Sequence, residues 1–146
     1  MIKHLLALSS ICFLFACGNN TTKDESKPVA IDKHCYVYND TSNVITLTAI
    51  YAKDSVSGTL AYDIDKKDKN IGTFAGTVKG DMIVADYTFM SEGKTSVRQV
   101  AFKKSGSSLV GAMGEMEEKD GKMVFKSMNG LDFNHAIILT ETDCNK

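Results

Sequence analysis

Apolar and polar residues alternate along most of the chain from residue 34 onward. In residues 56–64, for example, Val56, Leu60 and Tyr62 alternate with Ser57 and Asp63. A period of two places successive side chains on opposite faces of a β-strand, so that one face is apolar. Interrupted by polar turns, this pattern predicts strands over residues 35–38, 44–51, 56–64, 71–79, 82–90, 97–103, 108–113, 122–128 and 135–142.

Regular strand spacing without a convincing helix predicts an all-β fold. Short strands joined by short polar turns are typical of an antiparallel meander, here a closed or nearly closed small β-barrel of about 8–10 strands. A β-sandwich is the alternative. Glycines inside the predicted strands favour the barrel, because strand glycines allow the bends that closure requires. They are Gly58, Gly72, Gly76 and Gly111.

The first residues have a different pattern. An apolar run from Leu5 to Phe15 follows a short basic start, which is typical of a secretory signal. The run is too short to span a membrane, which takes roughly 20 apolar residues. Leu14-Phe15-Ala16-Cys17 resembles the lipobox of bacterial lipoproteins. This resemblance implies a signal peptide over residues 1–16 and a mature chain that begins with Cys17, acylated by palmitate or a similar lipid.

Residues 17–33 are predicted to be the lipidated cysteine and a flexible tether. The stretch 18–28 contains no large apolar residue, so it cannot bury surface to offset its ordering entropy. Within it, Lys23-Asp24-Glu25 is similar to the export tag that follows the lipidated cysteine in surface lipoproteins of Bacteroidota. The resemblance implies a protein anchored in the outer membrane, facing either the cell surface or the periplasm. Residues 34–146 then form one β-barrel domain.

Two cysteines remain in the body of the chain, Cys35 and Cys144. Outside the cytosol a lone pair of this kind usually forms a disulfide. This bond would join the first predicted strand to the end of the last and staple the sheet where it meets itself. A metal pair with His34 is the alternative, but a closed zinc site needs four ligands. We therefore expect a disulfide and no metal.

The body resembles small lipoproteins of flavobacteria, a group without an established activity. The stretches that carry the resemblance are 57–62, 72–81, 85–93 and Val97-Arg98. It implies a location and a fold, but no chemistry. More loosely, the meander is similar to calycin-type barrels such as lipocalins, an analogy of architecture that does not fix function.

Charge and motifs narrow the classes of function. The chain has 17 basic and 18 acidic residues, with Arg98 as its single arginine and no basic block. Nucleic acid is therefore not an expected partner. The chain contains neither a Gly-x-Ser-x-Gly elbow nor a His-Glu-x-x-His motif. No catalytic residue and no cofactor are predicted.

Arg98 is the most informative side chain, since by alternation it faces inward with Val100 and Phe102. A guanidinium inside a barrel needs a carboxylate or several carbonyls around it. Glu92 and Glu115 are within reach. Arg98 could close one barrel end through such a salt bridge, or it could hold the acid group of a ligand.

The tyrosines Tyr62 and Tyr87 are also predicted to face inward, where they either line a cavity or form internal hydrogen bonds. With Arg98 and Glu92 they are the candidate ligand-binding residues. Two functions follow as hypotheses. The first is a non-catalytic module that binds a small apolar or amphipathic ligand inside the barrel. The second is an envelope interaction or assembly protein, or an enzyme inhibitor, that acts through its loops.

Overall fold

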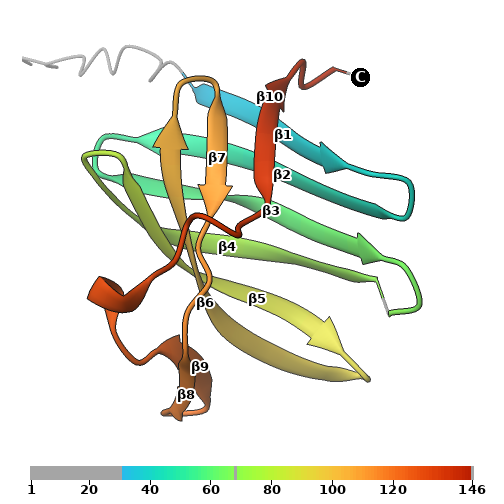
Figure 1. Ribbon diagram of the computed structural model, residues 1–146, viewed down its shortest axis with the longest axis vertical. Helices are drawn as coiled ribbons and strands as arrows, with labels where there is room; N and C mark the ends of the chain where they lie inside the picture. Colours follow the sequence, from blue (N-terminus) through green and yellow to red (C-terminus); the bar gives the residue numbers. More distant parts are fainter. Residues whose placement is uncertain (1–30, 68, 146) are drawn as a thin grey trace, which may run out of the picture.

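The protein is all-β in a computed structural model that describes residues 31–67 and 69–145 (Figure 1). Its strands are β1 (Asp32–Asn39), β2 (Asn43–Ala52), β3 (Ser55–Ile64), β4 (Asn70–Lys79), β5 (Met82–Ser91), β6 (Lys94–Ser105), β7 (Ser108–Gly111), β8 (Met116–Lys119), β9 (Lys122–Phe125) and β10 (Ile138–Thr142). Within these residues one 3-10 turn, η1, covers Met128–Gly130. No helix in the described ranges is long and apolar enough to cross a membrane.

Eight of the strands form a closed antiparallel barrel. Neighbouring strands follow the order β5-β4-β3-β2-β1-β10-β7-β6, and pairing of β5 with β6 completes the ring. Strands that follow one another in the sequence from β1 to β7 pair with each other, and β10 lies between β7 and β1. The predicted closed barrel is confirmed, and the sandwich alternative is wrong.

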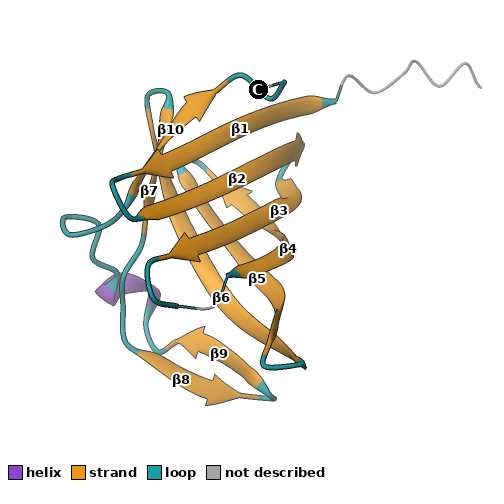
Figure 2. Ribbon diagram, turned by 90° about the vertical axis from the view of Figure 1, so that its right-hand side faces the viewer, coloured by secondary structure: helices purple, strands orange, loops and turns teal. Residues whose placement is uncertain are grey.

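The remaining two strands form a hairpin outside the ring. β8 pairs with β9, and β9 contacts β6 through a single parallel bridge between Arg98 and Met123. The turn between β8 and β9 has positive φ at Asp120 (52°) and Gly121 (76°), the combination that an Asp-Gly tight turn favours. Figure 2 shows this hairpin below the ring, beside β6. The strand predicted over 122–128 therefore exists in part, but it does not belong to the barrel wall.

The barrel interior is a packed apolar core. Leu60 is 0% exposed and Leu109 is 1% exposed, so both side chains are fully removed from water. Burial of such a side chain stabilises the fold by about 1.5–3 kcal/mol. The prediction that Tyr87 faces inward is confirmed, because Tyr87 is buried together with Ile83 and Ala85 on the same face of β5.

Strand glycines are required where two strands approach closely. A Cβ added at Gly58 would lie 1.8 Å from the carbonyl oxygen of Thr48, and one at Gly76 would lie 2.0 Å from that of Val84. Gly58 also pairs across the sheet with Phe74, whose ring lies 3.1 Å from the added Cβ. The space that the missing side chain leaves is therefore used by the backbone and by an aromatic ring.

The seam between β1 and β10 joins the two ends of the barrel chain. Three residue pairs form this seam: Cys35–Thr142, Tyr36–Glu141 and Val37–Thr140. A disulfide links Cys35 to Cys144, with a Cα–Cα distance of 5.2 Å and a sequence separation of 109. The predicted disulfide at the closing seam is confirmed.

The N-terminal boundary of the barrel lies slightly earlier than the sequence suggests. β1 begins at Asp32, so Asp32 and Lys33 belong to the barrel wall and not to the predicted tether. The predicted signal peptide, the lipidated Cys17 and the tether up to residue 30 lie outside the described residues.

Candidate functional site

A cleft of about 310 Å³ opens in the barrel wall beside β6. The cause is the shortness of β7, which has four residues against the twelve of β6 and ends where Gly111 pairs with Phe102. Earlier residues of β6 therefore have no barrel strand on that side. The cleft is lined by Ile45, Tyr62, residues 98–102, residues 111–114, Met116, Phe125, Ile137 and Leu139.

Both faces of β6 contribute to the cleft. Val100 and Phe102 face the barrel interior, whereas Gln99 and Ala101 have the opposite parity and face outward. The chain after β7 folds over this outer face, where the amide of Ala112 donates a hydrogen bond to the carbonyl of Ala101 at 2.8 Å. The cleft thus extends from the barrel interior to the space beneath the covering segment.

The β8–β9 hairpin forms the outer wall of the cleft. The amide of Phe125 donates to Oε1 of Gln99 at 3.1 Å, and Lys122 pairs with Asp86 on the outer face of β5. These contacts hold the apolar side chains of Met116 and Phe125 over the opening. One wall of the site is therefore attached to the barrel by a small number of polar contacts.

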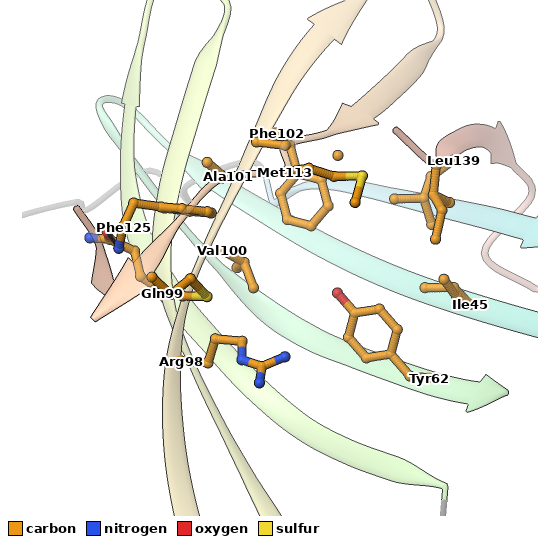
Figure 3. A pocket seen from close by; sticks show the side chains of 15 residues that line it. Ile45, Tyr62, Arg98, Gln99, Val100, Ala101, Phe102, Met113, Phe125 and Leu139 are labelled. Atoms are coloured by element: carbon orange, nitrogen blue, oxygen red, sulfur yellow. Dashed lines mark hydrogen bonds between the residues drawn. The ribbon is translucent and has the colours of Figure 1, made fainter. Parts of the chain in front are cut away.

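Two of the predicted ligand-binding residues meet in the cleft. Figure 3 shows the guanidinium of Arg98, from β6, and the hydroxyl of Tyr62, from β3, projecting into the same space. Arg98 is exposed, and Tyr62 is half-buried. Arg98 is the only charged residue among those that line the cleft. The local charge of the site is therefore positive.

The salt bridge predicted for Arg98 is absent among the described residues. Glu115 pairs instead with Lys126, at 3.2 Å between Nζ and Oε2. Glu92 lies exposed in the turn between β5 and β6, with a φ of 50°, and does not line the cleft. The expectation that either carboxylate neutralises Arg98 is wrong.

Tyr62 presents a protonated hydroxyl to the cleft. Burial raises the pKa of Tyr62, and the positive charge of Arg98 opposes this rise. The phenol is thus a hydrogen-bond donor at neutral pH. Its ring packs edge-on against Tyr87, with 5.8 Å between the ring centroids, which fixes the direction of the hydroxyl.

Tyr87 belongs to the core. It is 2% exposed, and its ring stacks on Phe89 with a centroid distance of 4.8 Å. Burial raises the pKa of Tyr87 to about 12, and its hydroxyl has no hydrogen-bond partner within the described ranges. Tyr87 therefore supports Tyr62 and does not line the cleft itself. Of the four candidate ligand residues, the structure brings only Arg98 and Tyr62 to the opening.

A second cluster of titratable residues, which the sequence did not reveal, lies at the other end of the barrel. Nδ1 of His34 lies 2.5 Å from Oε1 of Glu141, and Nε2 lies 2.8 Å from Oδ1 of Asp32. The hydrogen bond to Glu141 is the main cause that raises the pKa of His34, and burial opposes it. The cluster joins β1 to β10 next to the disulfide.

The alternation of residues places Asp32 and His34 on one face, but the position of Glu141 depends on the nonlocal register between β1 and β10.

No three His, Cys, Asp or Glu residues in the described part of the chain are arranged to hold a metal ion. Comparison with protein-family models, with curated proteins and with solved structures gives no match.

Proposed function

We propose that this chain is a lipid-anchored protein of the outer membrane that binds a small apolar or amphipathic ligand in the cleft, without catalysis. The cleft carries this proposal. Its volume of about 310 Å³ lies at the lower end of the range for small-molecule sites, roughly 300–1,000 Å³. Its lining is mostly apolar, with Arg98, Tyr62 and Gln99 as its polar side chains. A few polar groups in an apolar cleft are typical of sites that orient a ligand.

The chemistry of the lining supports a binding role over an enzymatic one. The lining residues include no Asp, Glu, His, Cys or Ser. A general acid or base must lie within hydrogen-bond reach of the proton that it moves. Tyr62 is the one lining side chain of a type that serves as a general acid or base, and no second such group lines the cleft with it, so the lining favours retention of a ligand.

The anchor is proposed from the lipobox resemblance at Cys17. The barrel is compatible with an anchor at Cys17. Its first strand begins at Asp32, which pairs with Tyr51 at one end of the barrel. The cleft lies toward the opposite end, at Ile45 and Tyr62. A tether that joins the barrel at Asp32 would leave access to the cleft open.

The anchor is tested with Cys17→Ser in cells that are fed labelled palmitate. The wild-type chain should carry label and sediment with the cell envelope, whereas the variant should lose both properties. Label on the variant, together with sedimentation in the envelope fraction, would show that the proposed anchor is wrong.

Ligand binding is tested by native mass spectrometry of protein purified without detergent. Met116 lines the cleft, whereas Met128 is 42% exposed and does not line it, so Met116→Glu and Met128→Glu are a matched pair. A bound mass should be present in the wild type and in Met128→Glu, and absent in Met116→Glu. Bare wild-type protein that also fails to take up 1-decanol would overturn the proposal. One dominant partner in cellular crosslinking would then favour the loop-mediated interaction.

A further inference from the structure

We infer that the ligand of the cleft is an amphipathic monocarboxylate, a molecule with one acid group on an apolar body, and that Arg98 and Tyr62 hold the acid group. This inference rests on the proposed function, since it names the class of ligand that the cleft would take. Three features of the cleft support it: its unpaired cation, its second hydrogen-bond donor and its lack of any other charge.

The first feature is the state of Arg98. Its guanidinium projects into the cleft, and no carboxylate among the described residues lies within ion-pair distance of it. Five N–H donors in a planar fork match the two oxygens of a carboxylate. An anion in the cleft would gain charge-assisted hydrogen bonds, whereas a cation would meet a like charge.

The second feature is the hydroxyl of Tyr62, which projects toward the same space from the opposite side of the cleft. Neither this hydroxyl nor the guanidinium of Arg98 makes a side-chain hydrogen bond to another described residue. Both donors are thus available to the same acceptor. A carboxylate, with about four lone-pair sites on two oxygens, can accept hydrogen bonds from both.

The third feature is the apolar remainder of the lining. Val100, Phe102 and Leu139 form the inner wall, and Met116 and Phe125 form the outer wall. A second charge on the ligand would be buried there without a partner, which is unfavourable. Flexible Met and flat aromatic side chains can follow an apolar body of varied shape. The cleft therefore favours one acid group over two.

The test is calorimetric titration of the purified protein with three probes that share a tail: decanoate, 1-decanol and decyltrimethylammonium. Decanoate should bind about tenfold more tightly than 1-decanol, as expected for a charge-assisted hydrogen bond that is partly exposed. Decyltrimethylammonium should bind more weakly than both. Arg98→Gln should reduce decanoate affinity to that of 1-decanol, and Arg98→Lys should restore part of the difference.

Lys103→Gln is the matched control. Lys103 lies on the same strand as Arg98 but faces outward, where it is exposed and its Nζ lies 3.7 Å from Oδ2 of Asp81. Its replacement should therefore change the affinity for neither decanoate nor 1-decanol. Circular dichroism of each variant establishes that the barrel is intact. Equal affinities of the wild type for decanoate and 1-decanol would overturn the ligand class and leave the proposed function standing. Binding of none of the probes would overturn both.

Discussion

The two ends of the barrel differ in how one side chain on each, His34 or Arg98, is paired. At the end where β1 begins, His34 contacts both Asp32 and Glu141, and Nζ of Lys104 lies 4.0 Å from the centroid of the Tyr51 ring. At the other end, Arg98 has no ion-pair partner among the described residues. His34, at the first end, is thus paired within the chain. The unbalanced charge at the second end is available to a ligand.

Strand length explains the difference. Strands β2 to β6 have ten to twelve residues, whereas β7 has four and β10 has five. Both short strands complete the ring near the His34 end, where the β1–β10 seam and the disulfide lie. Neither short strand extends as far as Arg98. The β8–β9 hairpin covers the gap there and is held by few polar contacts. One barrel thus combines a sealed end with an open one.

The largest expected effect concerns the sealed end. Cys144→Ser should lower the free energy of unfolding by about 2–5 kcal/mol, because the disulfide closes a loop of more than 100 residues in the unfolded chain. Urea unfolding of the variant and the wild type measures this. Reduction of the wild type should cause a similar loss, and should cause none in the variant.

The same variant sharpens the comparison between the ends. Because the disulfide lies at the sealed end, Cys144→Ser should leave the affinity for decanoate unchanged under conditions in which the protein stays folded. Equal stability of oxidised and reduced wild-type protein would show that the seam does not depend on the disulfide. A change in decanoate affinity would show that the two ends are coupled.

The sequence predicted the barrel well because its signals there are local. Alternation over residues 56–64 and 82–90 identifies strands and their inward faces without knowledge of the partner strand. The turn at Asp120-Gly121 is also encoded locally, by residues that tolerate positive φ. The position of the two cysteines, on the first strand and after the last, predicted the closing seam.

The cleft could be predicted only in part, because it depends on nonlocal arrangement. Val100 and Phe102 follow from alternation, but Gln99 and Ala101 have outward parity and join the cleft only because the chain folds back over β6. The sequence held one clue. Between Gly111 and Ile138 the alternation weakens and glycines recur at 114, 121 and 130, which is typical of an excursion from a barrel wall.

The pairing of Arg98 was predicted wrongly for a related reason. Glu92 and Glu115 are close to Arg98 in sequence or in expected position, but the direction of a turn side chain depends on local φ and on neighbouring cations. Lys126 binds Glu115 because β8 and β9 form a hairpin of their own. Proximity in sequence is therefore a weak guide to which charged side chains form an ion pair.

A smaller effect at the sealed end is a dependence of stability on pH. The folded-state pKa of His34 is raised, mainly by its hydrogen bond to Glu141. This stabilisation is fully present below the unfolded pKa of about 6.5 and is lost as pH rises through the higher folded pKa. Since both carboxylates are more than a third exposed, the loss should be less than about 1 kcal/mol. Unfolding free energies at pH 5.5 and 8.5 measure it.

Two variants separate this effect from other titrations. Glu141→Gln should shrink the difference between the two pH values, because the amide cannot stabilise the imidazolium as a carboxylate does. His135→Gln should leave most of the difference in place, because His135 lies away from the seam and its pair with Asp132 is exposed and screened by solvent. A pH difference that is the same in the wild type and in Glu141→Gln would contradict the assignment to His34.

The smallest expected effect is at the open end, where Arg98→Gln should change the free energy of unfolding by no more than about 0.5 kcal/mol. Removal of one partner of a buried salt bridge costs about 3–5 kcal/mol, but Arg98 is exposed and has no such partner in the described part of the chain. Urea unfolding without ligand measures the change. A loss above about 1 kcal/mol would restore the structural interpretation, in which Arg98 closes the barrel. With decanoate present, the wild type should gain stability that the variant does not, because ligand binding to the folded state stabilises it by mass action.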